Sequence, residues 1–172
     1  MIRRTKKQCP ELVLPDDKEY LECVKDILRN ESFLSMQNFI QHGTTTCLEH
    51  CLNVSYRSYL FCKKHNLNYR AAARAGLLHD LFLYDWHFHA KLTGNCFHGL
   101  THPKCALENA RREFKLNDIE ANSILRHMFP LTPHPPRYRE GNVIMWYDKV
   151  CGIMEILRRP AYKQSAILAQ PI

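Results

Sequence analysis

Apolar and small side chains recur in this chain at steps of three and four residues, the spacing of one face of an α-helix. The longest example begins at about Thr44 to Thr46, which offer N-caps, and ends near His65. Its face consists of Leu48, Cys51, Leu52, Ser55, Tyr59 and Cys62. No segment alternates with a period of two for long enough to predict a sheet. Glycine is scarce, with six residues, and no Gly/Ser linker occurs. We therefore predict an all-α fold, a single helical bundle of about seven helices.

Capping residues and prolines place the predicted helices at about 16–28, 32–40, 44–65, 69–83, 101–114, 117–128 and 142–157. The segment Pro130 to Arg139 holds four prolines and cannot be helical throughout. The loop 84–100 is long for a compact domain, which indicates a functional role, and we expect it to cover the site. Its Tyr84, Trp86 and Phe88 could stack a nucleotide base, and its His87 and His89 could lie near the site.

The length of 172 residues fits one domain. We divide the chain into a basic N-terminal arm (1–15), the helical domain (16–158) and a C-terminal tail (159–172). The formal charge is +7, but Arg3, Arg4, Lys6 and Lys7 lie in the arm, and without them 20 basic residues face 17 acidic ones. This disfavours nucleic acid as a partner and leaves a modest attraction for small anions. No apolar run could span a membrane and no export signal follows the basic start, so we predict a cytoplasmic protein with no membrane partner.

The eight cysteines do not form a recognisable metal or disulfide pattern. No C-x-x-C pair occurs, and Cys47 and Cys51, one helical turn apart, lack a second pair that would complete a zinc site. The chain is long enough to fold without disulfides. We therefore expect reduced thiols that act as small core residues.

Four histidines and two aspartates form the pattern that points to chemistry: His50, the adjacent pair His79-Asp80, His102, His127 and Asp148, all on or next to predicted helices. Carboxylates buried among apolar residues need a cation, and neutral imidazole is the commonest protein ligand of a divalent metal. Six ligands are too many for one catalytic zinc, which takes three. They suit two octahedral ions if one carboxylate bridges. Nitrogen and oxygen ligands without thiolate favour manganese or iron, with zinc, cobalt and nickel as alternatives.

This ordered set resembles the HD-domain superfamily of metal-dependent phosphohydrolases over about residues 44–157. Ala75-Gly76-Leu77-Leu78-His79-Asp80 resembles the apolar lead into the His-Asp pair of the family. His102-Pro103 followed by Cys105-Ala106 resembles the H-P-x-x-G-A segment of the dinuclear branch, with Cys in place of Gly. Leu125-Arg126-His127 and Trp146-Tyr147-Asp148 match its last two ligand positions.

The resemblance implies one metal held by His50, His79, Asp80 and Asp148, and a second held by Asp80, His102 and His127. Asp80, which would bridge the two, is the predicted catalytic residue. His98, four residues before His102, is an alternative to it as ligand. The branch that degrades cyclic di-GMP is disfavoured, because its Gly-Tyr-Pro signature is absent and Met128 stands where its additional histidine would be.

The expected activity is hydrolysis of a nucleotide or another small phosphate ester by a metal-bridging hydroxide. Candidates to bind the phosphate are Arg126, Lys149, Arg137 and Arg139. Two alternatives from other classes stay open: a mixed-valent di-iron oxygenase of the same superfamily, which would use the same ligands, and a non-catalytic nucleotide-binding helical module. The sequence does not distinguish monoester from diester, or monomer from homo-oligomer.

Overall fold

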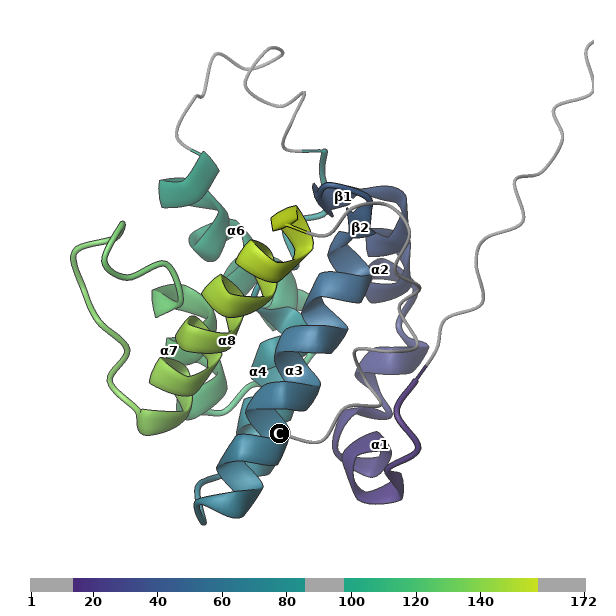
Figure 1. Ribbon diagram of the computed structural model, residues 1–172, viewed down its shortest axis with the longest axis vertical. Coiled ribbons are helices and arrows are strands. Elements are labelled where there is room, and N and C mark those ends of the chain that lie inside the picture. The colour runs from purple at the N-terminus through teal and green to yellow at the C-terminus, as the bar shows by residue number, and fades with distance from the viewer. Residues whose placement is uncertain (1–13, 86–97, 158–172) are drawn as a thin grey trace, which may run out of the picture.

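The computed structural model describes residues 14–85 and 98–157, with the side chain of His98 excepted. Within these ranges the chain forms seven α-helices, two short 3₁₀ helices and one small hairpin, so the prediction of an all-α fold is confirmed (Figure 1). The helices are α1 (Lys18–Val24), α2 (Glu31–Leu34), α3 (Cys47–Lys64), α4 (Tyr69–Leu78), α6 (His98–Glu113), α7 (Asp118–Arg126) and α8 (Arg139–Leu157). The 3₁₀ helices are η1 (Ile27–Arg29) and η2 (Ser35–Asn38). Most of the predicted arm and tail lies outside the described residues, and the domain bounds stay a prediction.

Helices α3 and α4 pack against each other at the centre, and α8 lies along α3 on one side, with α7 beyond it (Figure 1). The contact between α3 and α4 is very close at Gly76, where a Cβ atom would lie 2.6 Å from the Cα of Ser55. The Ser55 hydroxyl reinforces this contact by donating to the carbonyl oxygen of Ala73 at 2.6 Å. The central pair therefore depends on a residue without a side chain at position 76.

A buried arginine fixes α4 to its other neighbours. Arg74 Nε donates to Glu120 Oε1 in α7 at 3.1 Å, and Arg74 also pairs with Asp26, which follows α1. Because Arg74 and Glu120 are both buried, each charge needs the other. This network holds the helix that leads into the His-Asp pair.

Side-chain caps begin the helices where the sequence predicts them. Thr46 and Glu49 form a capping box at the start of α3, and Asn117 and Glu120 form another at the start of α7. Asn68 caps α4 by accepting from the backbone N–H of Ala71. These local signals are reliable because both partners lie within four residues of one another.

Several predicted bounds are wrong. Helix α4 ends at Leu78 instead of about Leu83, because the next backbone bond, from Leu81 N to Leu78 O, spans three residues and Leu83 adopts a positive φ of 59°. His79 and Asp80 therefore lie at the end of the helix. The segment predicted as one helix to about Leu28 divides into α1 and η1. Helices α6 and α8 each begin three residues earlier than predicted.

A short antiparallel hairpin, which the sequence did not predict, lies at the N-terminal end of α3 (Figure 1). Strands β1 (Ile40–His42) and β2 (Thr45–Thr46) are joined by a turn in which Gly43 has a φ of 58°. Strands of three and two residues are too short to give a period-two signal. The hairpin matters because β1 brings Gln41 and His42 to the site.

The six cysteines in the described ranges are free thiols, and five of them are buried, as expected of core residues. None of the described helices combines the length and apolar composition that crossing a lipid bilayer requires.

Candidate metal centre

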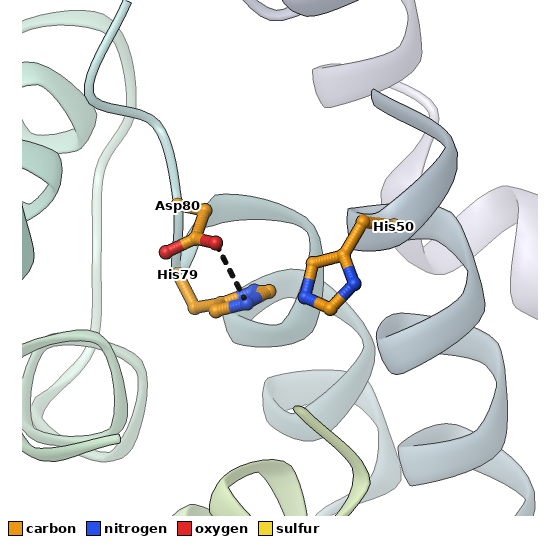
Figure 2. Close-up of side chains that lie close together, drawn as sticks. All are labelled: His50, His79 and Asp80. Atoms are coloured by element: carbon orange, nitrogen blue, oxygen red, sulfur yellow. Dashed lines mark ion pairs between the residues drawn. The ribbon is translucent and has the colours of Figure 1, made fainter. Parts of the chain in front are cut away.

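All six side chains predicted as metal ligands meet inside the bundle. His50 belongs to α3, His79 and Asp80 follow α4, His102 lies in α6, His127 caps the C-terminus of α7, and Asp148 lies in α8. Figure 2 shows His50 and the His79-Asp80 pair side by side, with the ring of His79 next to Asp80. The four imidazoles and Asp80 are at most 4% exposed. Burial of this many polar side chains indicates a site rather than packing.

The first cluster consists of His50, His79 and Asp80, whose candidate ligand atoms lie within 4.8 Å of one another. Asp148 joins them, because its Oδ1 lies 3.1 Å from His50 Nε2 and 3.7 Å from His79 Nε2. His79 Nε2 also lies 3.5 Å from Asp80 Oδ2. Ligand atoms about 2.1 Å from a common ion are at most about 4.2 Å apart, so these pairs have the spacing of one coordination sphere.

The second cluster consists of Asp80, His102 and His127. Asp80 Oδ1 lies 3.2 Å from His102 Nε2 and 3.5 Å from His127 Nε2, and the two Nε2 atoms are 2.9 Å apart. Asp80 thus directs one carboxylate oxygen toward each cluster. A carboxylate placed in this way could contact an ion in either cluster.

Backbone carbonyl groups orient two of the imidazoles. His79 Nδ1 donates to Gly76 O and His127 Nδ1 donates to Ile124 O, each over 2.8 Å and each three residues back along the chain. When each ring is neutral, its proton is on Nδ1 and the lone pair of Nε2 faces the cluster. Both histidines can do this because each follows the last residue of a helix, where carbonyl groups lack helical partners.

Two buried atoms give the clearest sign that a cation belongs here. His79 Nε2 and Asp80 Oδ1 make no hydrogen bond with any described residue, although both are fully enclosed. Such atoms cost about 1–3 kcal/mol each when they stay unsatisfied. Metal coordination would satisfy both. The donor set, buried imidazoles and carboxylates, fits divalent ions.

The electrostatics of the protein without metal show how strongly the clusters attract positive charge. Burial disfavours a charged His50, but the carboxylates of Asp148 and Glu155 outweigh it and raise the pKa of His50 to about 10. Burial opposes charge on His79 as well, yet Asp80 raises its pKa well above the usual range. The pKa of Asp80 is held well below its usual value, against burial, by His79 and then His102 and His127.

Three residues that surround the candidate ligands were not predicted from the sequence: Glu155, Gln41 and His42. Glu155 Oε2 accepts from His50 Nδ1 at 2.8 Å, and its other oxygen accepts from Asn53. Gln41 donates to Asp80 Oδ2 at 2.6 Å, while Cys47 donates its thiol hydrogen to Gln41 Oε1. Glu155 could have been found, because it lies seven residues after Asp148 and therefore on the same face of one helix. Gln41 gave no sequence signal.

A cavity of about 510 Å³ opens onto the clusters, and Asp80, His102, His127 and Asp148 form part of its wall. The third missed residue, His42, also lines it, with its ring 5.6 Å from that of His50. A volume of this size admits one small molecule. Four of the six candidate ligands therefore face the cavity, whereas His50 and His79 are not among its described wall residues.

The structure separates the four predicted phosphate-binding residues. Lys149 lines the cavity, where its Nζ donates to the carbonyl oxygen of His127 at 3.0 Å and lies 3.9 Å from Asp148 Oδ2. Arg126 is half-buried at the end of α7, and Arg137 and Arg139 are exposed. These three arginines are not among the described residues of the cavity wall.

Most of the predicted covering loop lies outside the described residues, including Trp86, His87, Phe88 and His89. Tyr84 is described, and its ring packs 5.0 Å from that of Phe82. His98 begins α6, but its side chain lies outside the described part, so it stays an alternative ligand.

The family model for the HD domain matches residues 47–153, which include all six candidate ligands. The chain therefore belongs to the HD-domain family, as the resemblance implied. HD domains are a superfamily made up mostly of metal-dependent hydrolases. Comparisons with curated proteins and with solved structures found no significant match.

Proposed function

We propose that this HD domain is a phosphohydrolase that uses two divalent metal ions to hydrolyse a small phosphate ester. The observation that carries the proposal is the position of Asp80. Its two oxygens face two separate clusters of imidazole nitrogens, and one of them is buried without a hydrogen bond. A mononuclear site would not need His102 and His127 to converge on that second oxygen.

Divalent ions in such a site lower the pKa of water and neutralise charge on phosphoryl oxygens. The protein itself supplies the position and the surroundings. Carbonyl groups and Glu155 hold the rings of His79, His127 and His50 so that Nε2 faces inward. Lys149 adds a positive charge on the cavity wall next to Asp148, where it can bind a phosphoryl oxygen. Manganese or iron remains our preferred metal.

The proposal is tested by metal content and phosphate release together. Asp80→Ala should lose both ions and all turnover, whereas His127→Ala should lose one ion per chain and keep the other. The exposed His134 offers a matched control, since His134→Ala should keep two ions and full activity. Elemental analysis and a phosphate assay with manganese-loaded protein give both readouts.

Three results would contradict the proposal. A wild-type content of one ion per chain would remove the dinuclear site. Two irons with oxygen uptake and no phosphate release would indicate the mixed-valent oxygenase. Nucleotide binding without turnover in manganese would indicate a non-catalytic module.

A further inference from the structure

The cavity changes in chemical character along α8. Asp148 and Lys149 line it next to the metal ligands, and Gly152, Ile153 and Ile156 line it farther along the same helix. With a rise of 1.5 Å per residue, the eight steps along the helix from Asp148 to Ile156 cover about 12 Å. The wall therefore extends for the length of a small molecule beyond the metal ligands, and it ends in aliphatic side chains.

Several polar side chains of the described wall already have partners. The amide of Gln41 bonds to Asp80 and Cys47, and Lys149 Nζ donates to two backbone carbonyl oxygens. The described wall also includes Gly99 and Met128. The ring of His42 lies at the near end of this stretch, since its Nε2 would be 3.2 Å from a Cβ at Gly152. Beyond it, Ile153 and Ile156 carry no side-chain donor or acceptor.

The two isoleucines are themselves unusually exposed. Ile153 is 58% and Ile156 is 64% exposed, so both leave much of their apolar surface in water when the cavity holds no ligand. Covering such surface with an apolar group is favourable, at about 25 cal/mol for each Å². A nucleoside base placed against the two isoleucines would bring donors and acceptors to side chains that offer them no partner, which is costly.

We propose that the substrate is a phosphate monoester of an aliphatic alcohol, with its phosphoryl group at the metal ligands and Lys149 and its hydrocarbon chain along Gly152, Ile153 and Ile156. This narrows the proposed function, on which it rests. Water attacks phosphorus, the bond between phosphorus and the alcohol oxygen breaks, and the alcohol leaves with a proton, so that inorganic phosphate and the free alcohol are the products. A single phosphoryl group matches the single cationic side chain of the described wall.

The test is a chain-length series. Binding of ethyl-, butyl-, hexyl- and octylphosphonate to manganese-loaded protein is measured by calorimetry, and kcat/KM is measured for the matching alkyl phosphates and for adenosine 5′-monophosphate. A fully buried methylene contributes about 0.8 kcal/mol, so each two methylenes should tighten binding by about 15-fold if enclosed and about 4-fold if half-covered. Octyl phosphate should be preferred to the nucleotide.

Ile156→Asn provides the matched comparison with Leu157→Asn. Both positions are exposed and lie in the last turn of α8, so neither change should unfold the protein, but only Ile156 lines the cavity. Ile156→Asn should reduce the gain from hexyl to octyl severalfold, and Leu157→Asn should leave it unchanged. An equal effect of both variants would overturn the placement of the chain.

The outcomes separate this inference from the proposed function. Hydrolysis of all the esters with the same kcat/KM, or preference for the nucleotide, would overturn the aliphatic substrate and leave the phosphohydrolase intact. Phosphonate binding that tightens with chain length, without hydrolysis of any ester, would support the apolar subsite and overturn the activity.

Discussion

The substitution Gly76→Ala adds one methyl group, and its effect tests both the packing of α3 against α4 and the metal centre. In an exposed helix, Gly→Ala stabilises by about 1 kcal/mol. At Gly76 the added Cβ would lie 2.6 Å from Ser55 Cα and 3.1 Å from Ser55 N, about 1 Å closer than carbon atoms pack favourably. Because these atoms belong to the backbone of α3, a side-chain rotation cannot relieve the clash, and α3 and α4 must move apart.

Overpacking of this kind costs typically 1–3 kcal/mol and sometimes more. We take the upper part of that range, subtract the gain in helix propensity, and expect Gly76→Ala to lower the free energy of unfolding by about 2 kcal/mol. For a chain of this size the corresponding loss is about 4–8 °C in Tm. Gly76 O also accepts from His79 Nδ1, so movement of α4 should weaken metal binding as well.

The assay is urea unfolding of the metal-free protein, followed by metal titration. Gly99→Ala is a matched control, since its Cβ would lie 2.7 Å from a neighbour, but that neighbour is the Cδ2 tip of Leu131, a 56% exposed side chain that can rotate away. The control should be nearly neutral. If Gly76→Ala unfolded at the same urea concentration as the wild type or higher, the close contact of the two helices would be refuted.

Two further predictions concern the metal centre. Glu155→Gln keeps the shape of the side chain but removes the charge that faces His50 Nδ1, so the metal affinity measured by titration should fall about 10- to 100-fold. Glu140 is another buried glutamate of α8, and Glu140→Gln should leave the metal affinity unchanged. Metal binding should also release protons, because a raised pKa keeps His50 and His79 protonated in the metal-free protein at pH 7 and a ligand must be neutral. Metal affinity should therefore increase as the pH rises toward 10. Calorimetry in buffers of different ionisation enthalpy measures the number of protons released. Metal binding without proton release would contradict the assignment of His50 and His79 as ligands.

The local features of the fold were predictable because their causes are local. Thr46 with Glu49 and Asn117 with Glu120 specify the starts of α3 and α7 within a few residues. The end of α4 was not predictable, because apolar residues continue to Leu83 in the sequence while the chain turns after His79. A helical pattern does not distinguish residues that are buried in a helix from residues that are buried just beyond one.

The helical class and the identity of the candidate ligands follow from the residue types and their spacing, since a buried His-Asp pair among apolar residues requires a charge partner wherever the chain places it. The arrangement of these groups depends on how the helices pack in the folded chain. The packing directs the two oxygens of Asp80 to different clusters and brings Gln41 and His42 in from the hairpin. It also places Lys149 on the cavity wall but not Arg126, Arg137 or Arg139. The reason is physical: the type of a residue specifies which interactions it needs, whereas the packing of distant helices determines which partners come within reach.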